Sequence, residues 1–121
     1  MLVKKETQLD EITNLLKIIS DKTRLIILLC LLDDDRCDIA NCKNCHHERC
    51  LVEKCVSDIV NELGLSQSLI SHQLKVLKNH HLLGYKKEGT TVYYYLIDRH
   101  VRLLVELALE HINEANKNLE D

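Results

Sequence analysis

"VNELGLSQSLISHQLKVLKNHHLLGYKKEGTTVYYYL", residues 60–96, decides the fold of this 121-residue chain. It opens on the end of a short helix, predicted to begin at Ser57 or Asp58 and to end before Gly64, a residue type that favours the left-handed conformation of a helix C-cap. Ser66 is a suitable N-cap for a longer helix, predicted over Gln67 to about His80. Two helices joined by a tight, glycine-containing turn are typical of a helix-turn-helix.

The longer helix has one apolar side and one small, polar side. Ile70, Leu74 and Leu77 recur at helical spacing and form its buried stripe. In a helix-turn-helix, the hydroxyl, amide and imidazole groups of the opposite side contact base edges in the major groove of DNA. The candidate DNA-contacting residues of this helix and its cap are Ser66, Gln67, Ser68, Ser71, His72 and Lys75.

Two runs rich in β-forming residues follow, and they meet at "KEGT", where Gly89 supplies the positive φ of a tight hairpin. Lys86 and Lys87 in this hairpin are suited to phosphate contacts, which position a protein on DNA. The segment from Leu65 to Ile97 carries a net charge of +3, whereas the rest of the chain carries −6. The two helices alone also fit an ordinary helical corner with a solvated face, but the basic hairpin favours DNA binding.

Outside this stretch the pattern is helical. Apolar residues at helical spacing predict a helix over 8–19, a buried helix over about 23–32 and a last helix from about Asp98 to about Lys117. The expected fold is mainly α with a small β-hairpin, in one domain over 1–121. No apolar run approaches the ~20 residues that span a bilayer, and no signal peptide is visible, so we expect no membrane partner and a cytoplasmic location.

The chain resembles the ArsR/SmtB family of metal-sensing repressors in three segments: "SQSLISHQLKVLK", "YKKEGTTVYYYL" and "ISDKTRLIILLCLL". The resemblance covers most of residues 8–117 and leaves the segment 33–54 outside it. It implies a winged helix-turn-helix, a homodimer that pairs through the first and last helices, and binding to double-stranded operator DNA. It further implies that metal releases the repressor and so derepresses genes for metal efflux or sequestration.

The last helix carries four candidate metal ligands: Asp98, His100, His111 and Glu114. Eleven residues of helix separate the two histidines by ~16 Å, so one ion cannot bind both from one chain. If the helix pairs antiparallel with its copy, Asp98 and His100 meet His111 and Glu114 of the second chain. Two nitrogen and two oxygen ligands suit Zn(II), with Co(II) as a mimic. The spacing is also similar to that of the family's zinc-sensing branch (SmtB/CzrA-like).

The segment "RCDIANCKNCHHERC", residues 36–50, shows neither helical nor strand periodicity and is predicted to be part of a long loop, 33–54. In a reducing compartment, dense cysteines favour metal binding or redox activity over disulfides. The candidate ligands of a second, softer metal site, for Cd(II), Pb(II) or Zn(II), are Cys37, Cys42, Cys45, Cys50 and Cys55. A thiol redox switch and a loop without any site are the alternatives.

The functional expectation is a zinc-responsive repressor. The alternative is a repressor that senses a soft metal (Cd or Pb) or thiol oxidation through the cysteine-rich loop. An enzyme is not expected, because the cysteines have no nucleophile elbow, oxyanion-hole glycines or orienting third residue near them.

The second metal site is tested by counting bound metal. We expect the Cys42→Ser/Cys45→Ser variant to bind one equivalent less soft metal per chain than the wild type, because the CxxC pair supplies two of the thiolates. Elemental analysis after dialysis measures the stoichiometry, and an unchanged count would remove the site.

Overall fold

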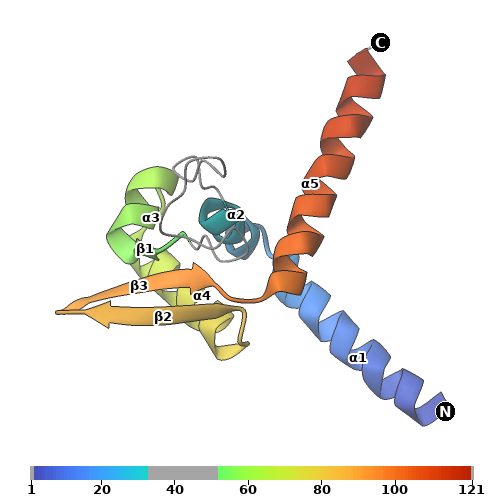
Figure 1. Ribbon diagram of the computed structural model, residues 1–121, viewed down its shortest axis with the longest axis horizontal. Helices are drawn as coiled ribbons and strands as arrows, with labels where there is room; N and C mark the ends of the chain where they lie inside the picture. The colour runs from blue at the N-terminus through green and yellow to red at the C-terminus, as the bar shows by residue number, and fades with distance from the viewer. Residues whose placement is uncertain (1, 33–51, 121) are drawn as a thin grey trace, which may run out of the picture.

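The computed structural model describes residues 2–32 and 52–120 as helices, strands and short connections. Three of the helices and the sheet form a body, from which the first and last helices project in different directions (Figure 1). The elements are α1 (Leu2–Ile19), α2 (Lys22–Leu32), β1 (Lys54–Cys55), α3 (Val56–Leu63), α4 (Gln67–Asn79), β2 (Leu83–Glu88), β3 (Thr91–Leu96) and α5 (Arg99–Glu120).

The predicted helix-turn-helix is present as α3 and α4. Gly64 ends α3 in the left-handed conformation, with φ 69°, and donates its N–H to the Val60 carbonyl at 2.8 Å. The Ser66 hydroxyl caps α4 by accepting from the Leu69 N–H at 3.3 Å. The turn between the helices is therefore set by the two local signals that predicted it, a glycine C-cap and a serine N-cap.

The predicted hairpin is β2 and β3, which turn at Gly89 with φ 63° and pair in the register Lys86↔Tyr93. The sheet has a third strand that was not predicted, and its strand order is β1-β3-β2. Strand β1 pairs Lys54 with Tyr94, so the predicted loop 33–54 was wrong at its last residue. Two residues are too few to show strand periodicity in a sequence.

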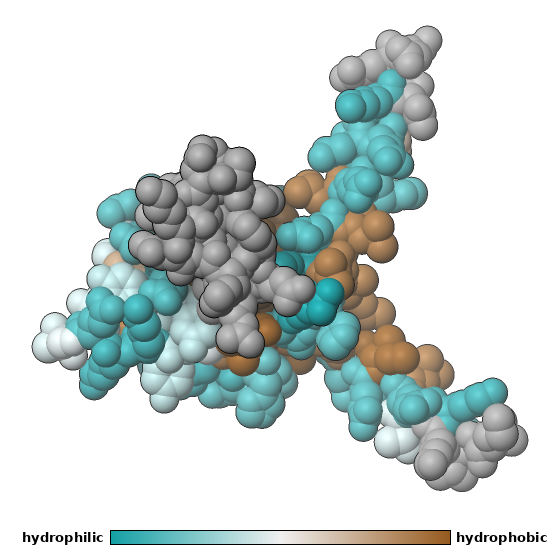
Figure 2. All heavy atoms as spheres, in the orientation of Figure 1, coloured by the Kyte–Doolittle hydropathy of each residue, from teal (hydrophilic) through white to brown (hydrophobic). Residues whose placement is uncertain are grey.

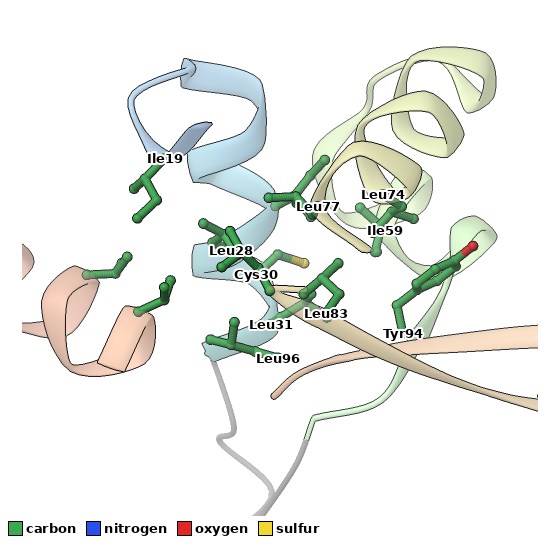
Figure 3. Close-up of a cluster of buried hydrophobic side chains, with 14 of the residues drawn as sticks. Ile19, Leu28, Cys30, Leu31, Ile59, Leu74, Leu77, Leu83, Tyr94 and Leu96 are labelled. Carbon is green, nitrogen blue, oxygen red and sulfur yellow. The ribbon is translucent and has the colours of Figure 1, made fainter. Parts of the chain in front are cut away.

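The hydrophobic core lies between α2, the helix-turn-helix and the sheet (Figure 3). All three apolar residues predicted for the buried side of α4 are completely buried. The largest fully buried side chains of the core are Ile27, Leu28, Leu31, Ile59, Ile70, Leu74, Leu77, Leu96 and Val101. Burial of a side chain of this size contributes about 1.5–3 kcal/mol, so this core fixes α4 against the body.

The two outer helices are longer than predicted. Helix α1 begins at Leu2 rather than near residue 8, since residues 2–7 contain no helix-breaking residue, and α5 continues to Glu120. The start of α5 agrees with the prediction: Asp98 caps the helix, which begins at Arg99. Within 2–32 and 52–120, no helix is long and apolar enough to cross a membrane.

A buried ammonium group joins β1 to α2 and α3. Lys54 Nζ donates to the Cys30 carbonyl at 2.8 Å and to Glu62 Oε2 at 2.8 Å, and it lies 3.4 Å from Cys30 Sγ. The Cys30 thiol in turn donates to Glu62 Oε2 at 2.7 Å. Only 9% of the Lys54 side chain is exposed, so these bonds replace its lost hydration. We call Cys30, Lys54 and Glu62 the Lys54 cluster.

The cluster changes the acidity of its three members. Burial, together with the hydrogen bond to Glu62, raises the pKa of the Cys30 thiol to about 11, so the thiol is neutral at physiological pH. Burial, the largest single effect, would lower the pKa of Lys54, but the hydrogen bond to Glu62 and the smaller effects of Cys30 and of the Glu62 charge together outweigh it, and the pKa is raised. Hydrogen bonds from Cys30 and Lys54 lower the pKa of the Glu62 carboxyl. The cluster therefore holds one ion pair and one neutral thiol.

Replacing Lys54 tests whether the cluster holds the body together. We expect Lys54→Ala to lower the free energy of unfolding by about 2–4 kcal/mol, because it removes the ammonium donor from the Cys30 carbonyl and leaves Glu62 with the Cys30 thiol as its donor in the cluster. The matched control is Glu53→Ala, which removes an exposed ion pair with Lys86 and should cost less than about 1 kcal/mol. Urea unfolding measures both variants, and equal losses would contradict a special role for Lys54.

The difference in stability between the wild type and Lys54→Ala should also depend on pH. The pKa of Glu62 is lower in the folded chain than its ordinary value of 4.5, so its contribution to stability is present above that value and is lost as the pH falls through the folded pKa. The difference in stability between the wild type and Lys54→Ala should therefore shrink on acidification below about pH 4.5. A difference that stays constant down to acid unfolding would exclude the pair.

Candidate functional site

The polar side of α4 lies at the surface. Ser66, Gln67 and Ser68 are exposed at its N-terminal end, and His72 and Lys75 are exposed one and two turns further along. Ser71, between them, is half-buried. The candidate DNA-contacting residues of α4 therefore form one surface, opposite the side that packs on the core. Small hydroxyl side chains at its N-terminal end leave room for a close approach of DNA.

The two lysines of the hairpin differ in their surroundings. Both are exposed, but Lys86 Nζ lies 2.9 Å from Glu53 Oε2 and 3.1 Å from Glu88 Oε1. The hydrogen bonds to these carboxylates raise the pKa of Lys86. In the part of the chain that the structure describes, Lys87 forms no ion pair. Lys87 is therefore the better placed of the two for a phosphate contact.

A contact between α4 and the hairpin was missed by the sequence analysis. Lys78 Nζ lies 4.9 Å from the centre of the Tyr85 ring, which is within the range of a cation–π interaction. The contact joins the end of α4 to β2, so it helps to orient the hairpin relative to the helix. No spacing rule relates a helical lysine to an aromatic residue on a later strand, and the sequence carried no signal for it.

Two of the four candidate metal ligands lie together at the start of α5. Asp98 Oδ1 accepts from the backbone N–H groups of His100 and Val101, at 2.9 and 3.0 Å, and thereby caps the helix. The His100 Nδ1 atom lies 3.8 Å from the same oxygen, and 96% of the His100 side chain is exposed. One carboxylate and one imidazole are thus close together and accessible from solvent, which suits half of a zinc site.

The other two candidates, His111 and Glu114, are exposed further along the unbroken helix α5. Within the described ranges of one chain, no group of three or more His, Cys, Asp or Glu side chains is close enough to hold a metal ion. The structure therefore does not bring the four together in one chain. A complete site from these residues requires a second chain, as the spacing of the histidines predicts.

An apolar surface covers α1 and α5 where they face each other (Figure 2). A groove of about 520 Å³ lies between them, with Leu16 and Ile19 on one side and Leu104, Ala108 and Ile112 on the other. We call the exposed apolar residues of the two helices the apolar face; they are Leu9, Ile12, Leu16, Leu103, Leu104, Leu107, Leu109 and Ile112.

Two apolar residues of α5 are not part of the apolar face. Val101 and Val105 are 1% and 4% exposed and belong to the core of their own chain. One side of the first turns of α5 packs on the body, whereas every described side chain from Glu106 to Lys117 is exposed. Uncovered surfaces with several large apolar residues mark interaction sites in soluble proteins.

Of the five candidate thiolate ligands, one lies within the described residues. Cys55 is buried at the N-cap of α3, with its Sγ 3.2 Å from the Ser57 hydroxyl oxygen, and its thiol is free. Cys37, Cys42, Cys45 and Cys50 lie outside the described residues.

Comparison with known proteins was made for sequence and for structure. The family described as "Bacterial regulatory protein, arsR family" matches residues 50–83, which include α3 and α4. The chain is 46% identical over 63 residues to a cadmium resistance transcriptional regulatory protein CadC homologue of Staphylococcus aureus, a match that covers 52% of each chain. The chain spans about half the length of the first curated relatives it matches.

Two further matches cover most of both chains. An uncharacterised HTH-type transcriptional regulator of Methanocaldococcus jannaschii is 30% identical over 101 residues, which is 84% of this chain and 94% of the relative. The solved structure of HlyU from Vibrio cholerae superposes with a TM-score of 0.65 at 30% identity, covering 85% of this chain and 92% of that one. These relatives agree with the expectation of a regulator rather than an enzyme.

Replacement of each hairpin lysine in turn tests the DNA surface. We expect Lys87→Met to weaken binding to a duplex of random sequence severalfold and to reduce the slope of log affinity against log salt by about 0.9, because one phosphate contact is lost. Lys86→Met is the matched control and should change the slope by less than half as much, since Glu53 and Glu88 already neutralise Lys86. Fluorescence anisotropy at several salt concentrations gives both slopes. A larger effect for Lys86→Met would contradict the assignment.

Proposed function

The chain belongs to the ArsR family of bacterial regulatory proteins, and from this premise we propose that it is a homodimeric, zinc-responsive repressor of transcription that acts in the cytoplasm. In the absence of zinc the dimer binds operator DNA with the exposed side of α4 and with the hairpin. Zinc binding lowers the affinity for the operator and releases genes for metal efflux or sequestration.

The observation that carries the zinc assignment is the arrangement of donors on α5. Asp98 and His100 are close together at one end of the helix, and His111 and Glu114 follow on its uncovered part. In an antiparallel pair of α5 helices, the two ends meet and give two equivalent sites of two imidazoles and two carboxylates. Such a ligand set fits Zn(II), and Co(II) is its usual mimic.

The apolar face supports the proposed dimer. Leu107 is 63% exposed and Ile112 is 56% exposed in a single chain, and Leu9 of α1 is 61% exposed. A second copy that covers these side chains by pairing α1 and α5 with their counterparts removes this apolar area from water, at about 25 cal/mol per Å². The same pairing assembles the zinc sites, so dimerisation and metal binding support each other.

The link to DNA is geometric. Zinc fixes how the two copies of α5 sit relative to each other, and this sets the distance between the two copies of α4. Operator half-sites lie about 34–36 Å apart, or a multiple of this, so a changed distance weakens binding. Coupling between two sites of this kind is typically about 1–3 kcal/mol, or ~5–150-fold in affinity.

A second candidate function is regulation by a soft metal or by thiol oxidation through the cysteine-rich segment. The name of the Staphylococcus aureus relative, a cadmium resistance regulator at 46% identity, favours it. Cys55, which neighbours that segment, lies at the N-cap of α3, the first helix of the helix-turn-helix. A ligand bound at Cys55 would act on the helix-turn-helix through the start of α3.

Subunit exchange tests the shared zinc site. The Asp98→Ala/His100→Ala chain and the His111→Ala/Glu114→Ala chain should each lose the site when alone. A mixture of the two should regain one intact site in each mixed dimer, because each chain supplies the half that the other lacks. Co(II) absorption is the measurement, since a nitrogen–oxygen site lacks the sulfur-to-cobalt charge-transfer band of a thiolate site.

Glu106→Ala on the same helix is the matched control and should leave both sites in place. Operator binding by the same mixture should respond to zinc, whereas binding by each double variant alone should not. If the mixture regains no nitrogen–oxygen site, the ligands do not meet across the dimer. If operator affinity of the wild type ignores zinc but changes with cadmium, the second candidate function replaces the first.

A further inference from the structure

Arg24, in the first turn of α2, contacts two other helices with its guanidinium group. Its Nε donates to the Ile18 carbonyl in the last turn of α1 at 2.8 Å. Its Nη1 donates to Gln73 Oε1 on α4 at 3.3 Å. The backbone N–H of Arg24 donates to Asp21 Oδ1 at 3.0 Å, which holds the start of α2 in place. One half-buried side chain thus connects the end of α1 with the DNA-contacting helix.

Gln73 does not face the DNA. It follows His72 in sequence, but the next residue on an α-helix is turned by about 100°, and Gln73 lies beside the core-facing residues Ile70 and Leu77, three residues before it and four after it. Its half-buried side chain is engaged by Arg24. The role of Gln73 is thus separable from base contact, and substitutions at Gln73 leave the surface formed by Ser68, His72 and their neighbours unchanged.

At its α1 end, the Arg24 contact lies next to the apolar face. Ile18 lies two residues after Leu16, which is 48% exposed and lines the groove between α1 and α5. Besides Ile19, which is buried, only Leu15 and Ile18 of the described α1 side chains pack against the core, and both are partly exposed. A change in the direction of α1 at the dimer contact therefore moves the Ile18 carbonyl, to which Arg24 is bonded.

We propose that Arg24 is a positioning residue that couples the direction of α1 in the dimer to the orientation of α4, through Ile18 on one side and Gln73 on the other. This coupling rests on the proposed function, because the dimer contact and the DNA surface are the two sites it connects. A guanidinium suits the task because it is planar and donates in fixed directions, so movement of one acceptor changes its bond to the other.

The first test compares operator affinity with and without zinc. In the wild type the ratio is expected within ~5–150-fold. In Arg24→Met and in Gln73→Leu it should fall to within about threefold of unity, while Co(II) binding stays unchanged. The double variant should lose no more than either single variant, as for two residues of one interaction. Gln73→Glu keeps an acceptor for the guanidinium and should retain the ratio, and Lys22→Met on the same helix is the matched control.

The second test needs neither zinc nor DNA. Leu16→Asp disturbs the dimer contact at an exposed position, and it should accelerate amide hydrogen exchange in α4 of the otherwise unchanged chain. In the Arg24→Met and Gln73→Leu backgrounds, Leu16→Asp should leave the exchange of α4 as it was. Because Leu16 and α4 lie on different parts of the molecule, a residue with a merely local role would not remove this effect.

The two tests separate the two claims. A wild type whose operator affinity ignores zinc contradicts the proposed inducer, and the exchange experiment then decides on Arg24 alone. A zinc-responsive wild type whose ratio survives in both Arg24→Met and Gln73→Leu overturns the coupling. Exchange in α4 that responds to Leu16→Asp equally in all backgrounds overturns it as well.

Discussion

The ammonium group of Lys54 is the constraint on which the rest of the body depends. A buried charge is tolerated only where its hydrogen-bonding capacity is met, and Lys54 meets it with a carbonyl and a carboxylate from two different helices. Strand β1 is thereby fixed to α2 and α3 at the same time. Because β1 pairs with β3, the hairpin and the helix-turn-helix become parts of one rigid unit. The proposed DNA surface takes side chains from both α4 and the hairpin, so it requires this rigidity.

The outer helices α1 and α5 differ from the body, because much of their apolar surface is not buried within one chain. Within one chain, α1 and the later turns of α5 bury little of their apolar surface, and two of the four candidate zinc ligands, His111 and Glu114, lie on this uncovered part of α5. The proposed regulation by zinc therefore depends on α1 and α5, whose apolar surface is covered only when a second copy of the chain binds. The Arg24 contact lies at the junction of the two parts, between the end of α1 and α4. In this account, the rigid body reads DNA and the dimer contact sets the spacing of the two bodies.

The sequence predicted the elements whose signals are local. Gly64 and Ser66 set the turn before α4, Gly89 set the hairpin, and the apolar period of Ile70, Leu74 and Leu77 gave the buried side of α4. It did not predict contacts between distant segments: the two-residue strand β1, the Lys54 cluster or the bond from Arg24 to Gln73. Periodicity and capping describe neighbours along the chain, whereas these contacts join residues that only the packed core brings together.

In the candidate site too, the sequence predicted the features with local signals and not the contacts between distant segments. The exposure of the α4 residues follows from helical period, but the pairing of Lys86 with Glu53 depends on where β1 lies. The spacing of His100 and His111 on a single helix already excludes one site in one chain, so this geometric statement needed no structure. The cysteine-rich segment is the most conspicuous feature of the sequence, but its four cysteines before residue 52 lie outside the described residues. The assignment of zinc to α5 therefore stands on geometry and donor chemistry.

The most direct test of the central claim is the affinity for zinc, measured by chelator competition with and without saturating operator DNA. If zinc and DNA act on one dimer in opposite directions, operator DNA must weaken zinc binding by the same factor by which zinc weakens operator binding. We expect this equality, with a factor of ~5–150. A zinc affinity that is the same with and without operator DNA would contradict it.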